Sequence, residues 1–168
     1  VSPANGAVWA LDTDEGALFL VSEAGAVVRE MRGWGAATVL AARADGGVWV
    51  GGVDDLTHLD RSGDFVASLD MARPVSQLSV DPRGTGVWAL LEGAVEVAKV
   101  SSAMRQVCRT PMPGAIAVAA SSMSDVCWVA MPDRIAQVRV DGSIGDLVVG
   151  YEGVVWMGAN ALDGSTWV

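Results

Sequence analysis

Apolar and polar residues alternate with a period of two along most of the chain, and Val is frequent among the apolar ones. This pattern is typical of short β-strands, and Gly, Asp and Ser cluster between the apolar segments, where turns are expected. Within 37–73 it predicts strands over 37–43, 47–51, 56–60 and 65–69. The same order of four strands recurs over 75–110 and 114–150, and no segment is long enough for a helix. The sequence therefore predicts an all-β chain of antiparallel strands joined by tight turns.

Five tryptophans mark an internal repeat. They are 40, 39, 40 and 39 residues apart, each after a turn-forming cluster: Trp9, Trp49, Trp88, Trp128 and Trp167. Four antiparallel strands in every 40 or so residues are typical of a β-propeller blade. A single blade leaves both faces uncovered and is stabilised by stacking against its neighbours, so we expect these rings to fill the space between blades. Gly25, Gly63 and Gly142 mark the same predicted turn in different repeats, where a hairpin requires a positive φ.

The repeat divides the chain into blades at approximately 1–36, 37–73, 74–112, 113–151 and 152–168, of which the first and last are partial. We favour a segment of a larger closed propeller, because an open set of blades would expose apolar faces and strand edges. One alternative is a ring of four blades in which a first strand at 154–159 completes the N-terminal blade. Another is a ring closed by a second copy of the chain.

The string from Pro74 to Ala89, PVSQLSVDPRGTGVWA, resembles the strand–turn–strand core of NHL-like propeller repeats and, more closely, of streptogramin-lyase-like repeats. Leu56 to Gly63 resembles their third strand and turn. This resemblance covers nearly the whole chain as a style of repeat, and it implies a β-propeller. Streptogramin lyases use a His and metal-binding acidic residues near the central channel. Here the only histidine, His58, lies in a predicted third strand away from the channel, so the resemblance does not extend to lyase activity.

Composition narrows the functional classes. The chain of 168 residues has 20 Asp and Glu against 11 Lys and Arg, and this net charge of −9 argues against a nucleic-acid partner. A hydrophobic content of 51% is too high for a disordered acidic tail. No apolar run approaches the roughly 20 residues of a membrane-spanning helix. Scarce lysine and abundant Ala, Gly and Val suggest a GC-rich bacterial genome, and propellers of this style are often exported, so we expect an extracytoplasmic, periplasmic or secreted, location.

Candidate sites are few. The acidic residues in the turns between second and third strands either contribute to a calcium site or remain solvated: Asp12, Asp14, Asp54 and Asp55. Three aromatic residues near the loops that enter first strands either bind a partner at the rim or cover a blade junction: Trp34, Tyr151 and Trp156. Cys108 and Cys127 are either two small buried residues or one disulfide.

We assign no catalytic residue. Ser121 and Ser122 lack the Gly-x-Ser-x-Gly arrangement of a nucleophile, and the predicted first strands are almost bare of metal ligands. We therefore expect a non-catalytic scaffold or binding module without a cofactor. It would be part of a larger bacterial protein and contact a protein or small ligand at its loop rim. The alternative is a metal-assisted propeller hydrolase, lactonase or lyase acting at the central channel.

Overall fold

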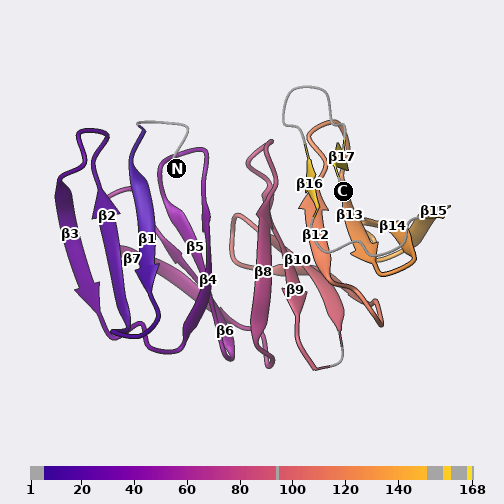
Figure 1. Ribbon diagram of the computed structural model, residues 1–168, viewed down its shortest axis with the longest axis horizontal. Coiled ribbons are helices and arrows are strands. Elements are labelled where there is room, and N and C mark those ends of the chain that lie inside the picture. Colours follow the sequence, from indigo (N-terminus) through magenta and orange to yellow (C-terminus); the bar gives the residue numbers. More distant parts are fainter. Residues whose placement is uncertain (1–5, 94, 151–156, 160–165, 168) are drawn as a thin grey trace. The chain divides into compact units, whose positions relative to one another are not determined.

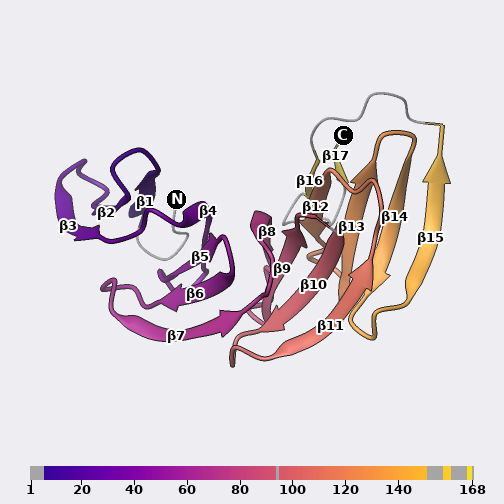
Figure 2. The same cartoon turned by 90° about the horizontal axis from the view of Figure 1, so that it is seen from below.

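The structure is a computed structural model that describes residues 6–93, 95–150, 157–159 and 166–167. All its regular elements are strands, and each pairs with its sequence neighbour in an antiparallel sheet (Figures 1 and 2). The chain divides into two compact units, Val1–Ser76 and Gln77–Val168. The all-β fold of four-stranded antiparallel blades predicted from the repeat is confirmed.

Within the described residues, five sheets follow one another in sequence order. The first has three strands: β1 (Val8–Asp12), β2 (Ala17–Val21) and β3 (Val27–Arg32). The second has four: β4 (Ala37–Ala42), β5 (Val48–Gly52), β6 (Asp55–Leu59) and β7 (Phe65–Asp70). The third comprises β8 (Val75–Val80), β9 (Gly86–Leu91), β10 (Glu96–Ser101) and β11 (Gln106–Pro111). The fourth comprises β12 (Ala117–Ala120), β13 (Val126–Met131), β14 (Arg134–Arg139) and β15 (Ile144–Val149), and the fifth is β16 (Gly158–Ala159) with β17 (Thr166–Trp167).

In the first unit, a buried cluster joins the first two sheets. Trp9 packs with Leu18 and Leu20 of its own sheet and with Val48 and Val50 of the next. The indole Nε1–H of Trp9 donates a hydrogen bond of 3.1 Å to the carbonyl of Gly46, in the turn between β4 and β5. This tryptophan therefore fills the space between two sheets, and its ring is hydrogen-bonded to the second of them.

In the second unit, Trp88 has the same place between the third and fourth sheets. Its ring is fully buried among residues of both, including Val97 and Val129. Cys108 and Cys127 belong to this cluster as free, buried thiols. Burial raises the pKa of both thiols, so they are protonated at neutral pH and pack as small apolar groups.

The tight turns follow the glycines. Gly25, Gly63 and Gly142 have φ values of +80°, +83° and +81° in the turns before the outermost strands β3, β7 and β15, in accord with their predicted conformation. Met104 takes the same place before β11 with a φ of +58°. Gly86 is required for another reason: a Cβ there would lie 2.0 Å from the carbonyl oxygen of Val100 on the neighbouring strand.

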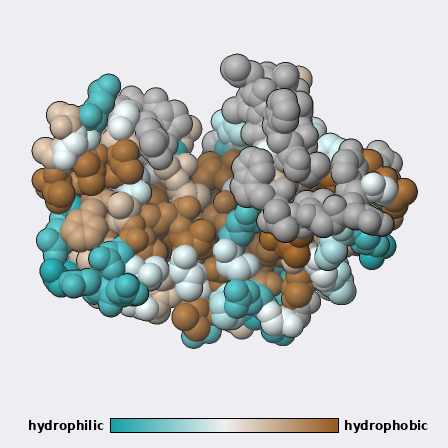
Figure 3. Space-filling model, viewed as in Figure 1, coloured by the Kyte–Doolittle hydropathy of each residue, from teal (hydrophilic) through white to brown (hydrophobic). Residues whose placement is uncertain are grey.

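Apolar residues also reach the surface at the start of the outermost strands. The side chains concerned are between 49% and 67% exposed: Val27, Val28, Phe65, Val66, Val107 and Ile144. Figure 3 shows apolar residues in brown interrupting the teal hydrophilic ones on one face. No helix capable of spanning a membrane is found among the described residues.

Candidate functional site

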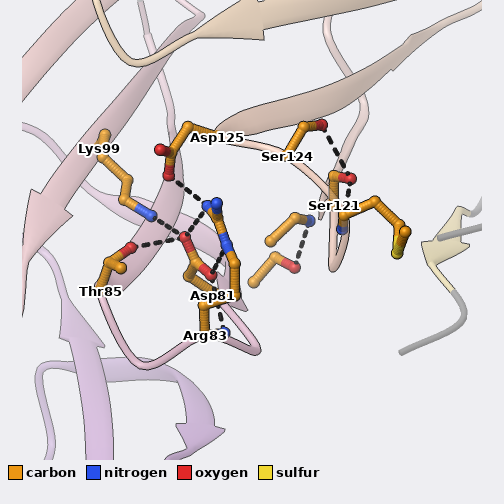
Figure 4. Close-up of polar contacts among 10 residues, drawn as sticks. Asp81, Arg83, Thr85, Lys99, Ser121, Ser124 and Asp125 are labelled. Carbon is orange, nitrogen blue, oxygen red and sulfur yellow. Dashed lines mark hydrogen bonds and ion pairs between the residues drawn. The ribbon is translucent and has the colours of Figure 1, made fainter. Parts of the chain in front are cut away.

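The main polar cluster lies in the turn between β8 and β9 (Figure 4). Asp81 follows β8 directly, and its backbone N–H donates to the carbonyl of Gly86 at the start of β9. Arg43 and Ser121 close the corresponding turns of the second and fourth sheets in the same way, by donating to Gly47 and Val126. The three positions are therefore equivalent, and only the third sheet has a carboxylate there.

The Asp81 carboxylate is saturated with donors. Oδ1 accepts from the backbone N–H of Arg83 at 2.9 Å and from its Nε at 3.1 Å. Oδ2 accepts from Lys99 Nζ at 2.8 Å, Thr85 Oγ1 at 2.6 Å and Arg83 Nη2 at 2.9 Å. Arg83 extends the cluster to Asp125, in the turn between β12 and β13. The network thus joins the third and fourth sheets and leaves the carboxylate of Asp81 no free lone pair for a ligand.

Lys99, the only lysine of the chain, is buried in this cluster. The Lys99 side chain is 3% exposed and that of Asp81 1%. Lys99 lies directly opposite Trp88 across β9 and β10, with its ammonium 5.1 Å from the ring centroid. Burial opposes ionisation of Asp81, but hydrogen bonds from Arg83, Lys99 and Thr85 outweigh it and hold the pKa of this carboxyl well below its usual range. The Asp81 carboxyl therefore stays ionised at neutral pH, and its hydrogen bonds fix the turn against the sheet.

In the first unit, the second sheet has a counterpart with the charges exchanged. Arg43 stands where Asp81 stands, and it donates to Asp45 through Nη2 at 2.8 Å. Its guanidinium lies 5.0 Å from the ring centroid of Trp49, which in turn lies 5.0 Å from the ring of His58. Within the described part of the chain, Trp49 Nε1 and His58 Nδ1 are buried without a hydrogen-bond partner. The hydrogen bond from Arg43 lowers the pKa of Asp45 to about 2.

These groups predict how stability depends on pH. Burial lowers the pKa of His58, and the Asp45 and Asp81 pKa values are also depressed. Because each pKa is lower in the folded than in the unfolded state, the unfolded state binds more protons than the folded state as the pH falls. The free energy of unfolding therefore decreases on acidification through all three groups. We expect the urea midpoint to fall first below about pH 6.5, through His58, and further below about pH 4, through the carboxyls.

The His58→Gln variant tests whether His58 causes the fall in the urea midpoint below about pH 6.5. We expect this variant to lose the pH dependence between about pH 7 and 5 and to keep the decline below about pH 4. The measurement is urea unfolding followed by circular dichroism at several pH values. If the urea midpoint of the wild-type protein did not change between pH 7 and 3, the effects attributed to His58, Asp45 and Asp81 would all be contradicted.

Polar side chains of the first strands bond to the neighbouring first strand. In the first unit, Thr38 Oγ1 lies 2.6 Å from the carbonyl of Val75 and 3.1 Å from that of Gly51, and it can donate to either. In the second unit, Gln77 Oε1 accepts from the backbone N–H of Val118 at 2.6 Å. Ser79 Oγ accepts from that of Ala120 at 2.8 Å. These side chains connect one sheet to the next through the main chain.

The candidate rim residues have different surroundings. Trp34 and Asp55 line a common recess of about 140 Å³. Asp54 belongs to the same turn as Asp55 but is not among the residues lining this recess. Asp12 accepts hydrogen bonds from the backbone of Asp14 and of the next residue and so stabilises its own turn. The described residues contain no group of three or more His, Cys, Asp or Glu side chains that could hold a metal ion. Tyr151 and Trp156 lie outside the described residues.

Sequence reasoning missed two features of the second unit. The first is the Asp81–Lys99 pair, for which a single lysine in the apolar strand EVAKVS was the available signal. The second is an apolar groove of about 280 Å³ formed by the end of β11, the chain before β12, and strands β13 to β15. Its lining residues are distant in sequence and include Pro111, Met112, Met131, Arg134, Ile144 and Leu147.

Comparison with known proteins places the chain in a structural class. No protein-family model matches it, and no curated protein matches by sequence. Virginiamycin B lyase from Staphylococcus aureus superposes with a TM-score of 0.77 at 14% identity, over 99% of this chain and 60% of that one. Hydrazine synthase from Kuenenia stuttgartiensis superposes with a TM-score of 0.76 at 12% identity, over 90% of this chain and 48% of that one.

The dihydro-heme d1 dehydrogenase NirN gives a TM-score of 0.70 at 13% identity, over 89% of this chain and 36% of that one. At these identities the likeness shows the fold, and the fold is that of β-propeller proteins. The chain spans between about a third and three fifths of the length of these three proteins. The resemblance in repeat style to streptogramin-lyase-like propellers is thus supported at the level of the fold.

Proposed function

We propose that this chain is a non-catalytic β-propeller scaffold within a larger protein, and that its loop rim binds a protein or a small ligand. The supporting observation is that polar side chains on the first strands form hydrogen bonds within the protein. Thr38, Gln77 and Ser79 bond to the backbone of the neighbouring first strand. Their hydroxyl and amide groups hold the sheets together, which is the role expected of a rigid support for variable loops.

Metal binding separates this proposal from a metal-assisted enzyme acting at the channel. The chain is dialysed against a chelator and then titrated separately with Ca²⁺, Mg²⁺, Mn²⁺ and Zn²⁺, with bound metal measured by elemental analysis. We expect no stoichiometric ion and an unchanged Tm. An ion present at 100 times its Kd would stabilise a specific site by about 2.7 kcal/mol, which a thermal scan detects readily.

Asp54→Asn and Asp55→Asn provide the matched controls for this titration. A stoichiometric ion that raises the Tm would overturn the non-catalytic scaffold and favour the metal-assisted enzyme. Loss of that ion in either variant would locate it in the turn between β5 and β6, whereas retention in both would locate it elsewhere.

A further inference from the structure

The recess beside Trp34 has the chemistry of a site for a cation. Its walls are the loop that enters β4 and the adjoining strands β5 and β6, with small residues Gly33, Ala36, Ala37 and Gly52 beside Val50. The two larger residues that line it are an aromatic and an acidic one, Trp34 and Asp55. We propose that this recess binds a small organic ammonium group, an inference that rests on the proposed role of the rim as a binding surface.

The aromatic side of the recess is held firmly. The backbone N–H of Trp34 donates to the carbonyl of Gly16 at 2.9 Å, and the carbonyl of Trp34 accepts from Ala37 at 2.8 Å. Its side chain packs against the buried cluster that contains Trp9 and Val50. A side chain packed in this way loses little further entropy when a ligand binds beside it. The face of an indole attracts a cation more strongly than that of any other aromatic side chain.

The carboxylate side is also oriented. Asp55 Oδ2 accepts hydrogen bonds from Thr57 Oγ1 at 2.9 Å and from Ser68 Oγ at 3.3 Å. Among the described residues, no hydrogen-bond donor is found for Oδ1 of Asp55. A Cβ on Gly52 would lie 2.4 Å from this Oδ1, so the carboxylate occupies space that a side chain at 52 would take. One oxygen thus anchors the side chain, and the other remains available for a positive charge.

The size and charge of the recess define the ligand further. A volume of 140 Å³ is below the roughly 300 Å³ of sites for drug-sized molecules, so it suits a single head group. No basic side chain is among the residues that line it. A compact organic cation suits both lining residues, because an indole ring and a carboxylate each attract a positive charge. The net charge of −9 also favours the approach of a cation.

Choline is a suitable probe, because its carbon isostere 3,3-dimethylbutan-1-ol has the same shape without the charge. The intact chain labelled with ¹⁵N is titrated with each compound and followed by NMR, through the indole N–H signals and, for the variants at Trp34, through the backbone amide signals of the lining residues Gly33, Ala36 and Gly52. The Trp34 signal is assigned from its loss in Trp34→Phe. We expect choline to shift the Trp34 signal with a Kd of about millimolar, and the isostere to bind at least about fivefold more weakly.

Substitutions separate the contributions of Trp34 and Asp55 to choline binding. We expect Asp55→Asn and Trp34→Leu each to weaken choline binding by about threefold to fivefold, and Asp54→Asn, on the adjacent residue, to leave it unchanged. The indole signals of the other tryptophans report whether each variant is folded. If Trp34→Leu unfolds, Trp34→Phe provides a second test because it keeps an aromatic ring. Its affinity for choline should lie between that of the wild type and that of Asp55→Asn.

The proposal is overturned if choline causes no shift at Trp34, if the isostere binds as tightly, or if Asp54→Asn and Asp55→Asn weaken binding equally. Failure here leaves the scaffold proposal in place, because that proposal is tested by the metal titration. Conversely, a stoichiometric metal ion overturns the non-catalytic scaffold without deciding what binds beside Trp34.

Discussion

Replacing Asp81 with Ala is expected to lower the free energy of unfolding by about 3–5 kcal/mol. The substitution leaves the Lys99 side chain, which is 3% exposed, without its carboxylate partner, and it also removes the acceptor of Thr85 and Arg83. The loss of one partner of a buried ion pair is costly because the remaining charge is neither solvated nor compensated. Urea unfolding at pH 7, followed by circular dichroism, measures the effect.

Two further variants distinguish the pair from its surroundings. Asp81→Leu combined with Lys99→Met replaces both charges by apolar groups of similar size, and it should recover at least about 1 kcal/mol relative to the single substitution. Asp45→Ala removes a carboxylate whose side chain is 58% exposed and should cost about 1 kcal/mol or less. If Asp81→Ala and Asp45→Ala proved equally mild, the buried pair would not stabilise the fold as described.

Trp88→Ala is the other substitution with a large expected effect, again about 3–5 kcal/mol. The ring is fully buried between the third and fourth sheets, and it also faces the Lys99 ammonium. Its removal leaves a cavity that strands on both sides cannot easily fill. Because the variant alters the fluorescence, unfolding is best followed by far-ultraviolet circular dichroism.

Trp88→Phe and Val107→Ala complete this comparison. Phe retains an aromatic ring in the cavity, so we expect a loss about half that of Ala. Val107 is 49% exposed on β11, and its truncation should change stability by about 0.5 kcal/mol or less. A Trp88→Ala protein as stable as the Val107→Ala protein would show that the stacking of the third and fourth sheets does not depend on this ring.

Much of the fold could be predicted because a propeller repeats one local pattern. The strand predicted over 65–69 and the repeat predicted to begin at 75 agree almost to the residue with β7 and β8, since turn residues bound them locally: Gly63 lies before the first and Pro74 before the second. The repeat predicted over 114–150 starts earlier than its first strand, β12, which begins at Ala117. Ala115 and Ile116 extend the apolar run, but nothing in their composition distinguishes a strand from the chain that leads into it.

The candidate site was less predictable, because its members come together only through the stacking of sheets. The sequence singled out Asp54 and Asp55 as a pair, whereas the structure gives only Asp55 a place in the recess with Trp34. Trp34 and Asp55 are 21 residues apart in the sequence, a spacing that gives no periodic signal. From the sequence, the first strands are considered only as sources of metal ligands; the bonds of Gln77 and Ser79 could not be predicted, since the N–H groups that donate to them lie on a different sheet.

The exchanged charges of equivalent turns have a consequence for how such a chain reaches its native order. Near-identical repeats risk pairing with the wrong neighbour during folding. Arg83 contacts Asp125 of the following sheet, but its counterpart in the second sheet is Asp45. If the second sheet took the place of the third, two carboxylates would meet at this contact and repel each other. The turns thus give the repeats distinct identities and oppose shuffling of one blade for another.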